Sequence, residues 1–450
     1  MSSSAGICVK RNLRCDHDRD RNRNDHNHLR QHRGTGNMLP FMTDIPATSS
    51  STATTAPAVA KHVRWWMLAL VFFCRVGLGF QFQTVASVAE PLAGQLAFSY
   101  TQIGTLIGLF MLPGLLLALP SGYAGRYLSD RTLVALGLST LAAGGLLTAV
   151  AQSFGLHALG RIVAGVGFVL SQVYLTKMVA DWFSRNELAT AMGIAVMSWP
   201  FGIAMGQVGH AWLALHLGWQ AAFLTASAYC AIGAIAILLL YKSPAATQQA
   251  PPRRTFGMPR AELVLTICVA TIWGLFNAGY VLYLSFAPKV LISGGYGATE
   301  AAAVISIASW VMIFSGTSCG QLADRTGKRD LILYVCMGVA VLALLLLKQT
   351  SMALVLSLLF GLIAIAPAGV IMALTGEVMA PQNRAFGMGV FFSVYFAVVT
   401  LAPPIGGWLF DRSGDPYAPI LFAAALFAAT ALANAGFRLV QRKIRSSSAS

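Results

Sequence analysis

The chain has 450 residues, of which 56% are hydrophobic and only 10% are charged. Soluble globular domains carry about 25% charged residues, so this composition excludes a water-soluble protein and indicates a largely lipid environment. The net charge of +15 would favour a nucleic-acid partner in a soluble protein. In so apolar a chain it favours basic cytoplasmic loops, and we expect no nucleic-acid partner.

The first 60 residues differ in composition from the rest. Residues 11–33 are rich in Arg, Asp, Asn and His, and residues 46–60 in Ala, Ser, Thr and Pro. Neither stretch can bury enough apolar surface to offset the entropy of ordering, so we expect a disordered basic tail. An alternative is translation from Met38 or Met42, in which case residues 1–37 are not made. The histidines and cysteines match no metal-binding spacing, and we predict no metal and no cofactor.

Apolar runs of about 20 residues follow, each long enough to cross a bilayer as a helix. The pattern predicts twelve spans, at 64–88, 101–121, 131–151, 156–180, 188–212, 220–241, 260–286, 299–321, 330–348, 352–378, 385–409 and 417–438. The predicted fold is therefore an all-α integral membrane protein.

The basic residues orient these spans. With a cytoplasmic N-terminus, 25 of the 31 basic residues fall in cytoplasmic segments and three in outer loops, namely Lys289, Lys348 and Arg412. Cytoplasmic loops are enriched in Lys and Arg, so we predict that both termini are cytoplasmic. Proline-rich residues 243–259 separate the spans six and six. We predict a tail (1–60), two six-helix bundles (61–242 and 260–438), a linker (243–259) and a tail (439–450).

Residues 320–329 carry a family resemblance. Gly320-Gln-Leu-Ala-Asp324-Arg325-Thr-Gly327-Lys328-Arg329 resembles the cytoplasmic signature loop of the major facilitator superfamily, at the place where that family has it. The resemblance covers about residues 61–440 and implies two rocking six-helix halves with a substrate site between them. In the family this loop acts as an inner gate; anchoring of the topology alone is the alternative.

The corresponding loop of the first half is Gly122-Tyr-Ala-Gly125-Arg126-Tyr-Leu-Ser-Asp130-Arg131. It lacks an acid at the position where the family pattern has one. Arg126 stands at or beside that position, and Asp130 is a candidate substitute. We therefore expect a weaker gate contact in the first half.

Two further helices resemble family helices. Gly160-Arg161-Ile-Val-Ala-Gly165-Val-Gly167 resembles the helix whose arginine serves coupling or substrate charge. Gly202 and Gly206 partly match an antiporter pattern, but Gln207 replaces its proline, so we interpret these glycines, like Gly165 and Gly167, as helix-packing positions.

Arg75 lies about halfway along the first span, and no acid lies at mid-membrane depth in any span. An intramembrane charge is a functional hypothesis by default. By the resemblance, the first, fourth, seventh and tenth spans line the central path. The predicted substrate-binding residues are Arg75, Gln83, Arg161, Gln172, Trp273, Asn277 and Tyr280. The alternatives are a structural Arg75 bonded to carbonyl groups and an Arg161 that extends to the interface.

These observations predict a secondary transporter in a bacterial inner membrane, acting as a monomer in the lipid bilayer on a small organic or inorganic anion symported with protons. An exporter of neutral or amphipathic compounds and a transporter-like receptor without flux are the alternatives. No phosphate loop, nucleophile elbow or HExxH motif is present, so we predict that the chain is not an enzyme.

Overall fold

The computed structural model describes residues 61–118, 120–183, 185–244, 257–380 and 382–447. The predicted tail 1–60 and most of the linker 243–259 lie outside these residues. The division into two bundles therefore stays a prediction, and the two halves are used below as names for residues 61–244 and 257–447.

The described residues are almost entirely helical. The first half contains α1 (Lys61–Ser87), α2 (Ala89–Leu96), α3 (Tyr100–Leu117), α4 (Asp130–Val150), α5 (Phe154–Trp182), α6 (Arg185–Leu217) and α7 (Trp219–Leu240), with a 3-10 helix at Pro120–Arg126. The second half contains α8 (Arg260–Ser293), α9 (Ala298–Thr326), α10 (Arg329–Leu346), α11 (Ala353–Leu359), α12 (Ala368–Val378), α13 (Arg384–Ser413) and α14 (Ala418–Ser447).

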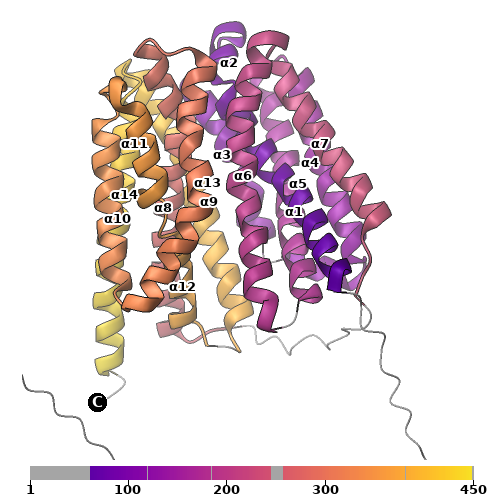
Figure 1. Cartoon of the computed structure of the whole chain (residues 1–450), viewed down its shortest axis with the longest axis vertical. Coiled ribbons are helices and arrows are strands. Elements are labelled where there is room, and N and C mark those ends of the chain that lie inside the picture. The colour runs from indigo at the N-terminus through magenta and orange to yellow at the C-terminus, as the bar shows by residue number, and fades with distance from the viewer. Residues whose placement is uncertain (1–60, 119, 184, 245–256, 381, 448–450) are drawn as a thin grey trace, which may run out of the picture. The chain divides into compact units, whose positions relative to one another are not determined.

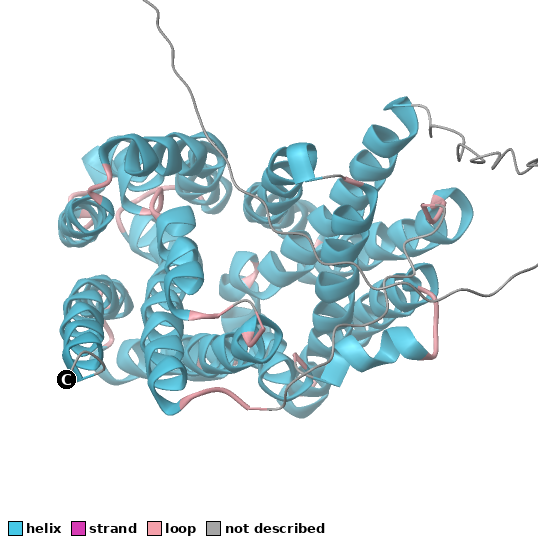
Figure 2. Cartoon of the chain, turned by 90° about the horizontal axis from the view of Figure 1, so that it is seen from below, coloured by secondary structure: helices cyan, strands magenta, loops and turns pink. Residues whose placement is uncertain are grey.

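The helices run roughly parallel in one bundle (Figures 1 and 2). Twelve helical segments of the described chain are long and apolar enough to cross a membrane. The predicted all-α membrane fold is confirmed. Large apolar side chains such as Leu116, Phe314 and Leu432 are more than 70% exposed, which is the arrangement expected where lipid replaces water.

Two details differ from the predicted spans. The short helix α2 follows α1 directly and was not predicted. The tenth predicted span consists of α11, a π-helical turn at Phe360–Ala364 and α12, which starts after Pro367. Proline lacks the backbone N–H that would continue the helix and clashes with the preceding turn, which explains the break.

Candidate functional site

Arg75 joins three helices of the first half. Its Nε donates to the carbonyl oxygen of Ala195 (3.1 Å) and to Ser198 Oγ (3.3 Å) in α6. Its Nη1 donates to Thr176 Oγ1 in α5 at 2.8 Å. Only 5% of Arg75 is exposed, and among the described residues neither a carboxylate nor any hydrogen-bond acceptor contacts its Nη2. Arg75 is thus a buried cation with one free donor group.

Gln172 lies one helical turn from the Arg75 contact. The Thr176 hydroxyl donates to the backbone oxygen of Gln172 at 2.7 Å. The side-chain oxygen of Gln172 is buried and has no partner among the described residues. Buried polar atoms are rarely left unpaired. Arg75 and Gln172 therefore bring an unpaired donor and an unpaired acceptor to the same part of the α1–α5 contact.

Arg161 has a different environment. Its guanidinium group donates to the carbonyl oxygens of Leu106, Gln81 and Phe82 and to Thr84 Oγ1, at 3.2–3.3 Å. The side chain is fully buried, with its guanidinium carbon 4.5 Å from the centre of the Phe110 ring. All three guanidinium nitrogens are therefore occupied by α1 and α3. Arg161 does not extend to the interface; it ties α5 to these two helices.

The two arginines do not converge on one point. Arg75 belongs to α1, and Arg161 contacts the same helix six to nine residues further along, roughly 10 Å along its axis. Of the two, only Arg75 keeps a free donor among the described residues.

Gln83 contributes to a buried connection between the halves. Its amide donates to Gln207 Oε1 and, at 3.4 Å, to Ser87 Oγ. Gln207 in turn donates to the carbonyl oxygen of Leu284 in α8 at 3.2 Å. Both glutamines are fully buried. This chain of amides crosses from α1 through α6 to the second half.

The predicted α8 residues make contacts within the second half. Asn277 donates to the carbonyl oxygen of Trp273 at 2.8 Å, and the Trp273 ring lies 6.3 Å from that of Tyr395. Tyr280 is buried and shares a 2.7 Å hydrogen bond with Ser309 of α9. Trp273 and Asn277 are partly exposed. They keep surface for a ligand, whereas the Tyr280 hydroxyl is already bonded.

The four glycines predicted at packing positions lie where helices approach closely. A Cβ on Gly202 would lie 2.2 Å from a carbonyl oxygen of α1, on Gly165 2.3 Å from one of α3, and on Gly167 2.4 Å from one of α4. A Cβ on Gly206 would lie 3.0 Å from that of Gln83. A side chain at the first three positions would force backbones apart.

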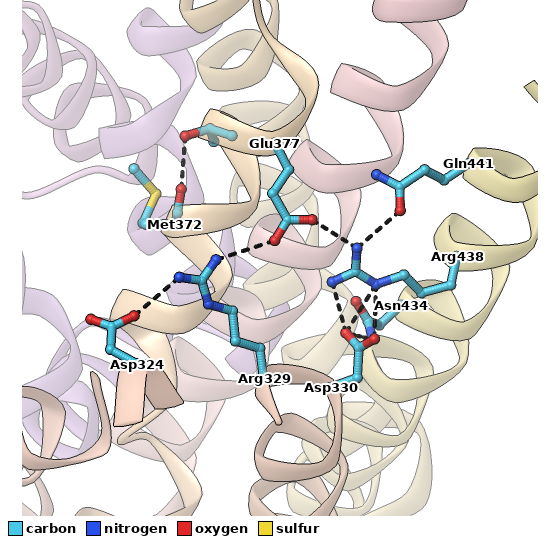
Figure 3. A network of polar contacts seen from close by, with 9 residues as sticks. Asp324, Arg329, Asp330, Met372, Glu377, Asn434, Arg438 and Gln441 are labelled. Carbon is cyan, nitrogen blue, oxygen red and sulfur yellow. Dashed lines mark hydrogen bonds and ion pairs between the residues drawn. The ribbon is translucent and has the colours of Figure 1, made fainter. Parts of the chain in front are cut away.

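The loop between α9 and α10 begins an ionic network (Figure 3). Asp324 pairs with Arg329 at 3.0 Å, and Arg329 contacts Glu377 of α12 at 3.3 Å. Glu377 also binds Arg438 of α14 at 2.8 Å, and Arg438 binds Asp330 at 2.9 Å. We call these five residues the α9–α14 network. Glu377, Asp330 and Arg438 were not predicted: Asp330 directly follows the loop, whereas only the fold brings Glu377 and Arg438 next to it.

Within the loop itself, Gly327 has φ +66°, a left-handed conformation that favours glycine at a helix end. Asp324 contacts Arg329, the first residue of α10, across this turn. Arg325 and Lys328 are exposed, and nothing lies within 4 Å of a Cβ built on Gly320.

The equivalent turn of the first half is held by a tyrosine. Tyr174 of α5 accepts a hydrogen bond from the Gly125 N–H at 2.5 Å and donates to the carbonyl oxygen of Ser121 at 2.8 Å. Asp130 forms a salt bridge with Lys177, which also binds Asp181. The side chain of Arg126 lies outside the described residues. Asp130 is therefore used to attach this turn to α5.

A family model described as Major Facilitator Superfamily matches residues 69–366, which is more than half of the chain. The chain belongs to the major facilitator superfamily. It is accordingly a multi-pass membrane transporter and not an enzyme, as the sequence predicted.

Individual relatives of this superfamily member are distant. It is 24% identical over 385 residues to a hexuronate transporter of Bacillus subtilis (strain 168), covering 78% of this chain and 89% of the relative. It is 26% identical over 184 residues to a probable L-galactonate transporter of Escherichia coli (strain K12), covering 41% and 40%. The crystal structure of a bacterial homologue of the human lysosomal transporter Spinster has TM-score 0.66 and 18% identity, covering 85% and 98%.

The transporter also has contacts between its halves that the sequence did not reveal. Asp411 of α13 accepts from the backbone N–H groups of Tyr100 (2.9 Å) and Thr101 (2.7 Å) at the start of α3. An acid at a helix N-terminus pairs with free N–H groups and the helix dipole. Glu90 pairs with Lys289 at the same predicted outer end. Glu90 and Asp411 each follow a predicted apolar span closely in the sequence. This position could have marked both acids as residues that hold the outer end closed.

Proposed function

We propose that this protein carries a small organic acid across a bacterial inner membrane, together with a proton, and that Arg75 holds the carboxylate of the substrate. The observation that carries the proposal is the free Nη2 group of a buried arginine that no described carboxylate neutralises. Placing an unpaired charge in a low-dielectric interior is costly, and an incoming anion removes that cost.

Geometry at Arg75 supports a carboxylate as the bound group. A guanidinium group presents donors in a planar fork that matches carboxylate oxygens. Ala195, Ser198 and Thr176 hold Nε and Nη1, so the direction of the remaining donor is determined by α5 and α6. The unpaired side-chain oxygen of Gln172 can accept from a substrate hydroxyl. This combination suits a hydroxylated acid.

The names of the relatives agree with such a substrate. Hexuronate and L-galactonate are sugar acids, each with one carboxylate and several hydroxyl groups. We therefore propose a sugar acid or similar hydroxy acid as the substrate class. Symport of one proton with one carboxylate moves no net charge, so a proton gradient can drive accumulation. The excess of basic residues on one side supports cytoplasmic termini, and we propose that a monomer suffices.

Arg161 acts as a positioning residue in this proposal. Its bonds to α1 and α3 hold α1 in place beside α5, which keeps Arg75 directed at Thr176 and Gln172. Transport then proceeds by rocking of the two halves about the site.

Uptake into proteoliposomes tests the assignment of Arg75. With an inward proton gradient, the natural protein should accumulate labelled D-glucuronate, and a protonophore should abolish the accumulation. Arg75→Gln should lower the uptake rate at low substrate at least about thirtyfold, because losing a buried charged partner costs about 2–5 kcal/mol. Arg75→Lys should retain part of the rate, since it keeps the charge but loses the fork.

Arg442→Gln, at an exposed arginine near the end of α14, is the matched control and should transport like the natural protein. Unchanged uptake by purified, monodisperse Arg75→Gln would overturn the anchoring role. Equal uptake of D-glucose and D-glucuronate by the natural protein would overturn the anion proposal and favour the neutral-compound alternative.

A further inference from the structure

A cavity that does not include Arg75 lies at the predicted outer end. It has a volume of about 490 Å³ and lies between α1, α2, α6, α8 and α9. Its charged lining residues are Glu90 of α2 and Lys289 of α8, and Gln95, Gln207 and Ser285 add neutral polar groups. A cavity of this size holds a small organic acid with room for water.

The charged pair in this cavity joins the two halves. Lys289 Nζ lies 2.6 Å from Glu90 Oε2, and the Tyr100 hydroxyl donates to Glu90 Oε1 at 2.6 Å. Lys289 Nζ also lies 5.6 Å from the centre of the Tyr100 ring. Of the salt bridges between described residues, this one alone connects the first half to the second. Opening of the outer end must therefore break it.

The pair is accessible enough to be exchanged. The side chains of Lys289 and Glu90 are 25% and 35% exposed, respectively. Partly exposed ion pairs contribute only about 1 kcal/mol or less, so another carboxylate can compete for the ammonium group. The anchor of the inner site, Arg75, is only 5% exposed by comparison. An acid arriving from outside therefore meets Lys289 first.

We propose that this cavity is an outer binding site for the substrate carboxylate, which replaces Glu90 on Lys289 while Glu90 takes up a proton from the outer solution. The inference rests on the proposed symport of an anion with a proton. It adds the place at which the protein first binds the anion and the proton. Lys289 stays protonated throughout, and the proton forms a new O–H bond on Glu90. The site changes from one ion pair to another, so its net charge is preserved.

The neighbours of Glu90 are consistent with this exchange. Tyr100 and Lys289 are the other titratable groups lining the cavity, and α1, α6 and α9 contribute only uncharged described residues to it. The next acid, Asp411 of α13, is already bonded to the backbone of Tyr100 and Thr101. Glu90 is therefore the group in this cavity suited to accept a proton when the substrate displaces it.

Loss of the Glu90–Lys289 pair also weakens the closed outer end. Only a proton and an anion together leave both groups neutralised, because either alone leaves an uncompensated charge. The exchange thus links opening of this end to the presence of both transported species.

Two substitutions in the full-length protein in proteoliposomes test the outer site. Glu90→Gln resembles protonated Glu90, and the initial rate of D-glucuronate uptake should then vary less than about twofold between an external pH of about 5.5 and about 7.5, whereas the natural protein speeds up several-fold on acidification. Lys289→Gln should raise the KM for external D-glucuronate by about fivefold, the effect of losing about 1 kcal/mol. Lys289→Arg should restore most of this affinity.

Matched controls separate these effects from general damage. Glu300→Gln and Lys348→Gln change exposed outer charges that do not line the cavity, and both should behave like the natural protein. A monodisperse Lys289→Gln protein with unchanged KM, or Glu90→Gln with full pH dependence, would overturn the outer site. If the natural protein transports no D-glucuronate or other sugar acid, the proposed function itself fails, a result distinguishable from failure of either variant.

Discussion

Two buried arginines differ in what surrounds their guanidinium groups. Arg161 donates to three carbonyl oxygens and a hydroxyl, whereas Arg75 keeps Nη2 unpaired among the described residues. The sequence identified both as unusual charges within spans. It could not separate their roles, because three of the four acceptors of Arg161 are backbone groups of α1 and α3, which carry no signature in the residue types.

Substitution of Arg161 should therefore lower stability. Arg161→Gln removes buried hydrogen bonds of a charged group that tie α5 to α1 and α3, and each such bond contributes about 1.5–3 kcal/mol. We expect a loss of at least about 3 kcal/mol in stability and a clear fall in melting temperature in detergent, measured by intrinsic fluorescence. The melting temperature of Arg75→Gln should fall less than that of Arg161→Gln. Equal melting temperatures for Arg161→Gln and the natural protein would contradict the positioning role.

Close contact between α3 and α13 depends on glycine. A Cβ on Gly104 would lie 2.1 Å from the Pro403 oxygen, and a Cβ on Gly407 would lie 2.0 Å from the Tyr100 oxygen. Asp411 then binds the start of α3. These contacts cross from one half to the other, so they exist only while the predicted outer end is closed.

Gly407→Ala should consequently favour an open outer end. The added methyl group overlaps a backbone atom in the closed state, and overpacking typically costs about 1–3 kcal/mol. A cysteine at Ala214, which lines the outer cavity, should react about tenfold faster with an impermeant maleimide, in a background whose other cysteines are alanine. Gly209→Ala, where a Cβ has nothing within 4 Å, should leave the reaction rate unchanged. If Gly407→Ala left the maleimide reaction equally fast or made it slower, the α3–α13 contact would not be what holds the outer end closed.

The described residues carry their ion pairs at the two ends of the molecule. One end has the α9–α14 network, and the other has the Asp411 and Glu90–Lys289 contacts. The network lies entirely within the second half, whereas the contacts at the other end join the halves. The two ends are therefore expected to respond differently when the halves rock.

Topology can be tested at two exposed lysines. Lys328 belongs to the α9–α10 loop, predicted to be cytoplasmic, and Lys348 lies in a predicted outer loop. In intact cells, Lys348→Cys should react with an impermeant thiol reagent, and Lys328→Cys should react only after the membrane is opened. The reverse pattern would overturn the orientation inferred from the basic residues.

The sequence by itself determined the membrane environment, the twelve spans and the family. These depend on the length of apolar runs and on one local loop, both of which are written in consecutive residues. It also singled out Arg75, because a charge in an apolar run is visible without a fold. Only the tertiary structure decided that Arg161 is tied to α1 and α3, that Tyr174 holds the first-half turn, and that Glu90 meets Lys289. The physical reason is that each contact joins residues on different helices, and an apolar helix can present its few polar groups to several neighbours until packing selects one.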